Sequence, residues 1–249
     1  LKDFPFENEN TGLFELTTRV TGVTLDYADG WPPLTNAVGE AVFRGRRMEI
    51  RPQAGSILGL RLSNVRASIP ELGKHDEHLL IKGVAEGPTA EFLRFVESSP
   101  VSRKIGGLTE NMQASGEARL DLEVNLPLRE IADSVISGVL AIRDNQFTVD
   151  PRLPPLEGFG ARIAFTGKTV NIKGGLARLA GNPFSFEGSN QKDGGLVLNV
   201  AGTMDVARLR NVSKHPALAF VEGQALWRGE IGVRGKVGSL SFDSGRVGS

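Results

Sequence analysis

Residues 116–126 read Gly-Glu-Ala-Arg-Leu-Asp-Leu-Glu-Val-Asn-Leu, and this alternation decides the fold class. From Ala118 to Leu126 every even-numbered residue is apolar and every odd-numbered residue is polar or charged. In an extended strand successive side chains point to opposite faces, whereas a helix would distribute this pattern around its circumference. The stretch therefore predicts a β-strand with one apolar and one polar face.

Shorter copies of this alternation recur along the chain. They lie at residues 14–20, 140–143, 163–165, 170–172, 184–187 and 196–200. Turn-forming pairs stand between them: Asp29-Gly30, Gly73-Lys74, Asp144-Asn145, Gly167-Lys168 and Asp193-Gly194. Turn signals spaced by roughly 8 to 12 residues are typical of strands joined by short turns, not of strands that alternate with helices. The chain is therefore predicted to be mainly β, with an antiparallel sheet.

Two segments carry helical signals instead. Residues 89–96 place Phe92 and Phe95 on one side at helical spacing, after a Gly-Pro-Thr start and before a Ser-Ser-Pro end. Residues 206–214 follow Asp205, whose carboxylate can cap a helix start. We expect two short helices.

The sequence also contains an internal repeat. The strand, glycine turn and strand at residues 43–50 recur at residues 165–172, and each copy is followed by a strand and one of the two helices. Self-similarity on this scale favours growth by stacking. We therefore expect residues 1–249 to be a single internal segment of a longer protein, with approximate repeat units at 12–128 and 129–249.

A sheet with one apolar face must cover that face, and two short helices can cover only a fraction of it. Leaving the rest in water costs about 25 cal/mol per Å² of apolar area. The sheet could fold onto itself as a sandwich, close as a barrel, or curl into an open gutter whose contents are not protein. The repeat favours the last, a long curved antiparallel sheet in the form of an open half-pipe, because an open sheet can be lengthened unit by unit.

Composition excludes several classes of protein. The 249 residues hold 29 Lys and Arg against 29 Asp and Glu, so no basic surface is expected for nucleic acid. There is no Cys, and hence no disulfide framework or thiolate chemistry. No run reaches the ~18 apolar residues of a membrane span, and the start shows no basic-then-apolar leader.

Two features of the sequence are candidates for a functional site: a cluster of possible metal ligands and a tryptophan. His75-Asp76-Glu77-His78 could hold a divalent ion in a metal-dependent hydrolase, but such a polar connection is ordinarily a solvated loop. Trp31 on a turn could stack on a sugar in a structural or carbohydrate-binding β-sandwich, or simply pack the edge of the sheet. We predict no catalytic residues, no metal, no cofactor and no enzymatic activity.

Residues 25–34, Leu-Asp-Tyr-Ala-Asp-Gly-Trp-Pro-Pro-Leu, resemble the YhdP branch of the AsmA-like family of Gram-negative envelope proteins. Ile-Pro-Glu-Leu at 69–72, the helical stretch at 87–100, Leu-Pro-Leu at 126–128 and Asp144-Asn145 support the resemblance. Order and spacing agree over most of residues 12 to 220.

The resemblance implies a periplasmic β-gutter that carries glycerophospholipids between the inner and outer membranes, with acyl chains on the apolar concave face. It also implies an inner-membrane anchor and contacts with both membranes through parts outside this chain, and it supplies no catalytic residues. The side chains expected to line the lipid path are Leu16, Val20, Leu120, Leu122, Val124, Leu126, Ile163, Phe165, Leu196 and Leu198.

Overall fold

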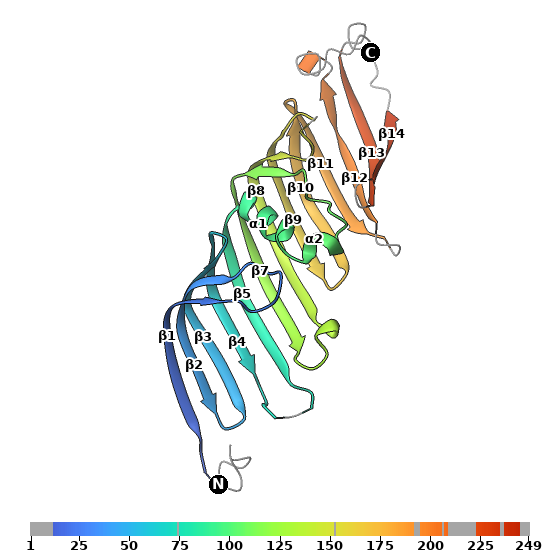
Figure 1. The fold of residues 1–249 in the computed structure, drawn as a ribbon. Helices are drawn as coiled ribbons and strands as arrows, with labels where there is room; N and C mark the ends of the chain where they lie inside the picture. The colour runs from blue at the N-terminus through green and yellow to red at the C-terminus, as the bar shows by residue number, and fades with distance from the viewer. Residues whose placement is uncertain are drawn as a thin grey trace. The chain divides into compact units, whose positions relative to one another are not determined.

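The computed structural model describes residues 12–73, 75–151, 153–191, 195–205, 207–208, 223–234 and 237–244. Within them, fourteen strands join one sheet in the order β1-β2-β3-β4-β5-β7-β8-β9-β10-β11-β12-β13-β14, with β6 paired to β8 off this path. The strands at the two ends of this order do not pair with each other, so the sheet is not closed into a barrel. The prediction of a mainly β, open antiparallel sheet is confirmed (Figure 1).

The strands have the following bounds: β1 Glu15–Leu25, β2 Leu34–Arg44, β3 Arg47–Ile57, β4 Leu60–Ile69, β5 His78–Pro88, β6 Gln113–Ser115, β7 Glu117–Pro127, β8 Val135–Thr148, β9 Leu156–Thr166, β10 Thr169–Leu179, β11 Asn182–Asn190, β12 Leu196–Asp205, β13 Gln224–Arg234 and β14 Val237–Ser244. The alternating stretch that predicted a strand is β7, and every shorter copy of it lies in a strand, apart from Phe14, which directly precedes β1. Both repeated glycine turns are tight hairpins, at Gly45 (φ 55°) and Gly167 (φ 57°), where glycine tolerates the left-handed backbone.

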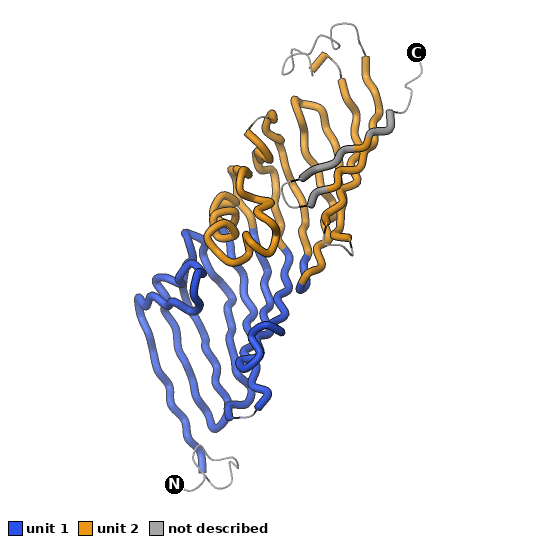
Figure 2. The backbone as a smooth tube through the Cα atoms, turned by 45° about the vertical axis from the view of Figure 1, so that its right-hand side comes forward, with its two compact units in different colours: residues 1–87, 119–139, 165–167 blue, residues 88–118, 140–164, 168–249 orange. Residues whose placement is uncertain are grey.

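The first predicted helix is confirmed as α1, Thr89–Glu97, with Thr89 and Phe92 buried. The short α2, Val101–Lys104, follows it. The second predicted helix, at 206–214, lies almost entirely outside the described residues. A 3-10 turn, Ile131–Asp133, joins β7 to β8. Figures 1 and 2 show α1 and α2 against one face of the sheet rather than in its plane.

The interpretation of Asp144-Asn145 as a turn between strands is wrong, because both residues lie inside β8. Asp144 has a left-handed backbone (φ 52°), which Asp and Asn tolerate better than most residues. The buried Asn145 amide then donates to the Thr89 hydroxyl (3.1 Å) and the Glu117 carbonyl (3.2 Å). Asp144 and Asn145 thus form an irregularity within β8, and the hydrogen bonds of Asn145 attach the start of α1 to the sheet.

The chain divides into two compact units, which Figure 2 distinguishes. Unit 1 comprises residues 1–87, 119–139 and 165–167, and unit 2 comprises residues 88–118, 140–164 and 168–249. Most of the buried apolar side chains lie in unit 2, where Ala161, Ile172, Ala177, Phe186 and Val200 form one cluster. The repeat units expected at 12–128 and 129–249 stay a prediction.

Candidate functional site

Strand register assembles one apolar face in unit 1. Residues that are direct partners in adjacent strands project to the same side of a sheet. Leu16 pairs with Phe43, Phe43 with Met48, and Met48 with Ile69, so one apolar row crosses β1 to β4. The same register places further apolar residues on this side. We define the unit-1 apolar face as Leu16, Val20, Val23, Ala37, Ala41, Phe43, Met48, Ile50, Leu60, Leu62, Ala67, Ile69, Ile81, Leu120, Leu122, Val124 and Leu126.

The other side of unit 1 is polar and crossed by ion pairs. Arg19 bonds Glu40 at 2.7 Å between β1 and β2, and Lys82 bonds Glu123 at 2.8 Å between β5 and β7. The latter contact fixes the sides of β7: since Glu123 lies on the polar side, its even-numbered neighbours lie on the apolar one. The two sides of unit 1 therefore differ as an amphipathic sheet requires.

Ion pairs with arginine also shift the pKa values of side chains on this polar side. A hydrogen bond from Arg51, reinforced by its charge, lowers the pKa of the exposed Glu49 carboxyl. Hydrogen bonds to Asp121 and Glu86 raise the pKa of Arg119. Both effects favour the charged forms, which keeps this surface solvated.

Leu120 and Phe165 are two expected lining residues that the structure brings together. A Cβ placed on Gly138 of β8 would lie 3.2 Å from the Leu120 Cδ1 atom and 2.7 Å from the Phe165 Cζ atom. The two side chains therefore approach each other above the intervening strand, where only glycine leaves room. This places Phe165 on the unit-1 apolar face as well.

Side-chain exposure distinguishes this face from a closed core. Leu16 and Val20 are 47% and 38% exposed, and the other expected lining residues of unit 1 are half-buried rather than buried. Unit 1 contains no α-helix among its described residues, and all described strands belong to one sheet. The β-sandwich alternative is therefore wrong, because no second sheet of the described chain covers these side chains.

Unit 2 has its own apolar face, also set by register. Leu198 pairs with Gly188 on β11 and Ile231 on β13, while Val200 pairs with Phe186. Ile163, Leu196 and Leu198, the three expected lining residues of unit 2, are half-buried and pack against the buried cluster. They thus lie on an apolar face, but one that is more filled than that of unit 1.

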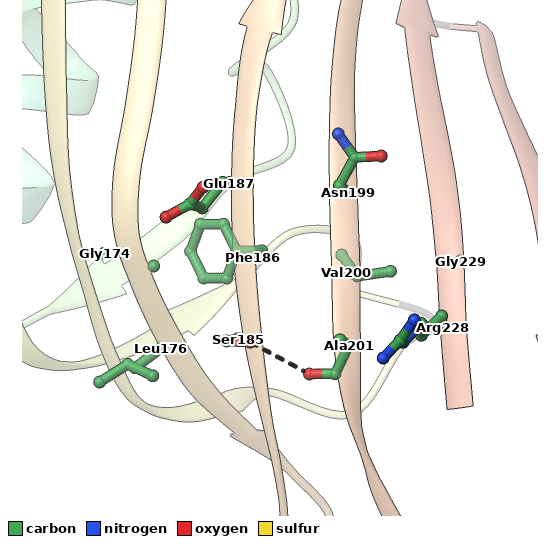
Figure 3. A pocket seen from close by; sticks show the side chains of 11 residues that line it. Gly174, Leu176, Ser185, Phe186, Glu187, Asn199, Val200, Ala201, Arg228 and Gly229 are labelled. Atoms are coloured by element: carbon green, nitrogen blue, oxygen red, sulfur yellow. Dashed lines mark hydrogen bonds between the residues drawn. The ribbon is translucent and has the colours of Figure 1, made fainter. Parts of the chain in front are cut away.

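A shallow depression of about 450 Å³ lies over β10 to β13 of unit 2 (Figure 3). Leu176, Ser185, Glu187, Asn199 and Arg228 line it, with a 3.3 Å hydrogen bond from the Ser185 hydroxyl to the Ala201 carbonyl. Phe186, Val200 and Ala201 also line it, so its walls combine apolar, neutral polar and charged residues. This arrangement supplies no nucleophile–base pair and no cluster of metal ligands.

The other chemical candidates are placed as follows. His75 and Asp76 are exposed in the connection between β4 and β5, and the His78 Nδ1 atom lies 2.6 Å from the Asn125 amide oxygen. No group of three or more His, Cys, Asp or Glu residues able to hold a metal occurs in the described residues.

Trp31 is half-buried, with its ring centroid 6.5 Å from that of Tyr27. Among the helices described, none is long and apolar enough to cross a membrane.

Comparison with known proteins adds to this geometry. A family model described as "YhdP protein" matches residues 1–247. The chain belongs to the YhdP family. A curated relative, the "Intermembrane phospholipid transporter YhdP" of Escherichia coli (strain K12), is 23% identical over 235 residues, which is 92% of this chain. The chain spans only 18% of that YhdP protein's length. No solved structure matches the chain significantly.

The aromatic contacts across the apolar face of unit 2 were not predicted from the sequence of this YhdP-family member. Phe184 and Phe186 stand two apart on β11, a spacing that already places both rings on one side. The pattern within one strand does not reveal the register between strands. In the structure, this register sets Gly175 opposite Phe186 and Gly202 opposite Phe184.

Proposed function

We propose that this chain is a segment of a lipid conduit in the periplasm, carrying glycerophospholipids between the inner and outer membranes. Acyl chains lie on the apolar side of the sheet, and headgroups stay in water at its rim. The protein acts by binding and passing lipid, without catalysis. Its membrane anchor and its contacts with the two membranes belong to parts of the protein outside this chain.

The half-exposed unit-1 apolar face carries this proposal. Its leucines, valines and isoleucines stand in register over β1 to β5, while ion pairs occupy the reverse side. Exposing apolar area costs about 25 cal/mol per Å². Binding of an apolar occupant to a face of this kind therefore lowers the free energy. Hydrocarbon chains fit best, because they add no polar group that the face would leave unbonded.

The expected selectivity follows from the same chemistry. Aliphatic walls respond to apolar area and shape and make no hydrogen bonds, so they do not distinguish headgroups. A conduit benefits from this weak selectivity, since lipid held tightly at one place would obstruct lipid behind it. The printed name of the E. coli relative supports phospholipid as the cargo. The balanced net charge of the chain does not favour nucleic acid as a partner.

Adjacent positions on opposite sides of β7 allow a sharp test. A photoreactive benzophenone amino acid is introduced at Leu122, on the apolar side, or at Glu123, on the polar side, and the chain is irradiated with phospholipid. We expect strong lipid crosslinks from position 122 and few from position 123. Equal labelling, or stronger labelling from position 123, would contradict acyl-chain binding on the apolar face.

A further inference from the structure

Five aromatic rings form a ladder across the apolar face of unit 2. The ring centroids of Phe147 on β8 and Phe159 on β9 lie 4.7 Å apart, and those of Phe159 and Phe186 on β11 lie 5.3 Å apart, both pairs stacked. Phe184 continues the series at 6.0 Å from Phe186 and 6.1 Å from Trp227 on β13. We call these five residues the aromatic ladder.

Glycines in the intervening strands allow the rings to meet. A Cβ on Gly175 of β10 would lie 2.5 Å from the Phe186 ring, so this ring lies directly over β10 and reaches Phe159 on the far side. On β12, Gly202 stands in register with both Phe184 and Trp227. The ladder thus depends on glycines at defined register positions.

The ladder fills the centre of its own face. Phe147 and Phe186 are only 8% and 7% exposed, and Ala161, Ala177 and Val200 near them are buried as well, whereas Phe159, Phe184 and Trp227 are half-buried. In the unit-1 apolar face, by contrast, only Leu60 and Ile69 are buried among the described apolar side chains. An acyl chain entering the centre of the unit 2 face would have to separate stacked rings, whose contacts are favourable beyond their buried area.

We propose that the aromatic ladder keeps acyl chains out of the centre of the unit 2 face, so that lipid binds on the unit-1 apolar face. This inference rests on the proposed function and states where on the chain the cargo is held. It separates the expected lining residues into two groups: those of unit 1 contact lipid, whereas Ile163, Leu196 and Leu198 pack against the protein's own rings. Phe159 and Phe186 are the positioning residues that maintain this exclusion.

Trp227, at the end of the ladder, is a natural reporter for the test. Phospholipids with bromine on the acyl chains quench tryptophan fluorescence only at close range. In a Trp31→Phe background Trp227 is the remaining tryptophan, because the sequence holds two. A second chain carries Trp31→Phe, Trp227→Phe and Phe43→Trp, which moves the reporter to the unit-1 apolar face. We expect brominated lipid to quench the reporter at position 43 several-fold more than Trp227.

The outcomes separate the inference from the function on which it rests. Equal quenching of both reporters, or stronger quenching of Trp227, would overturn exclusion by the ladder while leaving lipid binding intact. Quenching of neither would contradict the proposed function itself. In the first background, Phe159→Leu with Phe186→Leu should raise the quenching of Trp227, whereas the matched Phe165→Leu change in unit 1 should not. The comparison of the two reporters in chains that keep Phe159 and Phe186 decides the question even if the double variant folds poorly.

Discussion

Leu120 on β7 and Phe165 on β9 approach each other above Gly138, across the strand that separates them. Each comes from a different part of the sequence, and each projects to the apolar side of the sheet. The relationship requires that β8 offers no side chain at this point. It makes Gly138 the residue on which this part of the unit-1 apolar face depends.

Replacing Gly138 by Ala should destabilise the chain. The new Cβ would lie 2.7 Å from both the Asp121 carbonyl oxygen and the Phe165 ring, closer than real contacts allow. Overpacking of this kind costs about 1–3 kcal/mol, which chemical denaturation can measure as a fall in the free energy of unfolding. Gly160→Ala is the matched control, because its Cβ would meet nothing closer than 3.4 Å. Equal stability of the two variants would contradict the close approach at Gly138.

Leu122→Asp should remove lipid binding while leaving the sheet folded. Leu122 is half-buried on the apolar side, so a carboxylate there remains reachable by water but repels an acyl chain. The measurement is lipid phosphate extracted per mole of purified chain, with circular dichroism to verify the β content. Asp121→Asn, on the polar side of the same strand, should retain its lipid. Undiminished lipid phosphate in Leu122→Asp would count against binding on this side.

Asn145→Ala should loosen the attachment of α1. Its buried amide donates to the Thr89 hydroxyl and the Glu117 carbonyl, and removing a buried donor leaves both acceptors without this partner. A loss of about 1–3 kcal/mol in the free energy of unfolding is expected. Asn199→Ala provides the control, since Asn199 is exposed on β12. A stability loss no larger than in Asn199→Ala would show that the hydrogen bonds of Asn145 contribute little to stability.

The carboxyl of Glu49 should titrate below the usual range for glutamate, because Arg51 donates a hydrogen bond to it and attracts its charge. Since the folded-state pKa is lowered, the stabilisation is present above the unfolded-state pKa and is lost as the pH falls through the folded-state value. Arg51→Gln should raise this pKa, as NMR titration of labelled glutamates can measure. The stability difference from the unsubstituted chain should vanish in acid. An unchanged Glu49 pKa would exclude Arg51 as the cause.

The sequence predicted the features that follow from periodicity within one strand. Alternation identified β7 and its apolar side, and glycine turns identified the hairpins at Gly45 and Gly167. The prediction of a turn at Asp144-Asn145 was wrong because Asp and Asn are favoured both in turns and at left-handed positions inside a strand. The aromatic ladder could not be predicted, since it depends on the register of Gly175 with Phe186 between different strands.

Native mass spectrometry of the purified chain tests the central claim most directly. If the unit-1 apolar face binds acyl chains, the chain should retain near-stoichiometric lipid through mild purification, with masses that identify glycerophospholipids. Addition of phospholipid should increase the bound fraction until the unit-1 apolar face is filled. A well-folded chain that carries no lipid, and takes up none when phospholipid is supplied, would contradict the account.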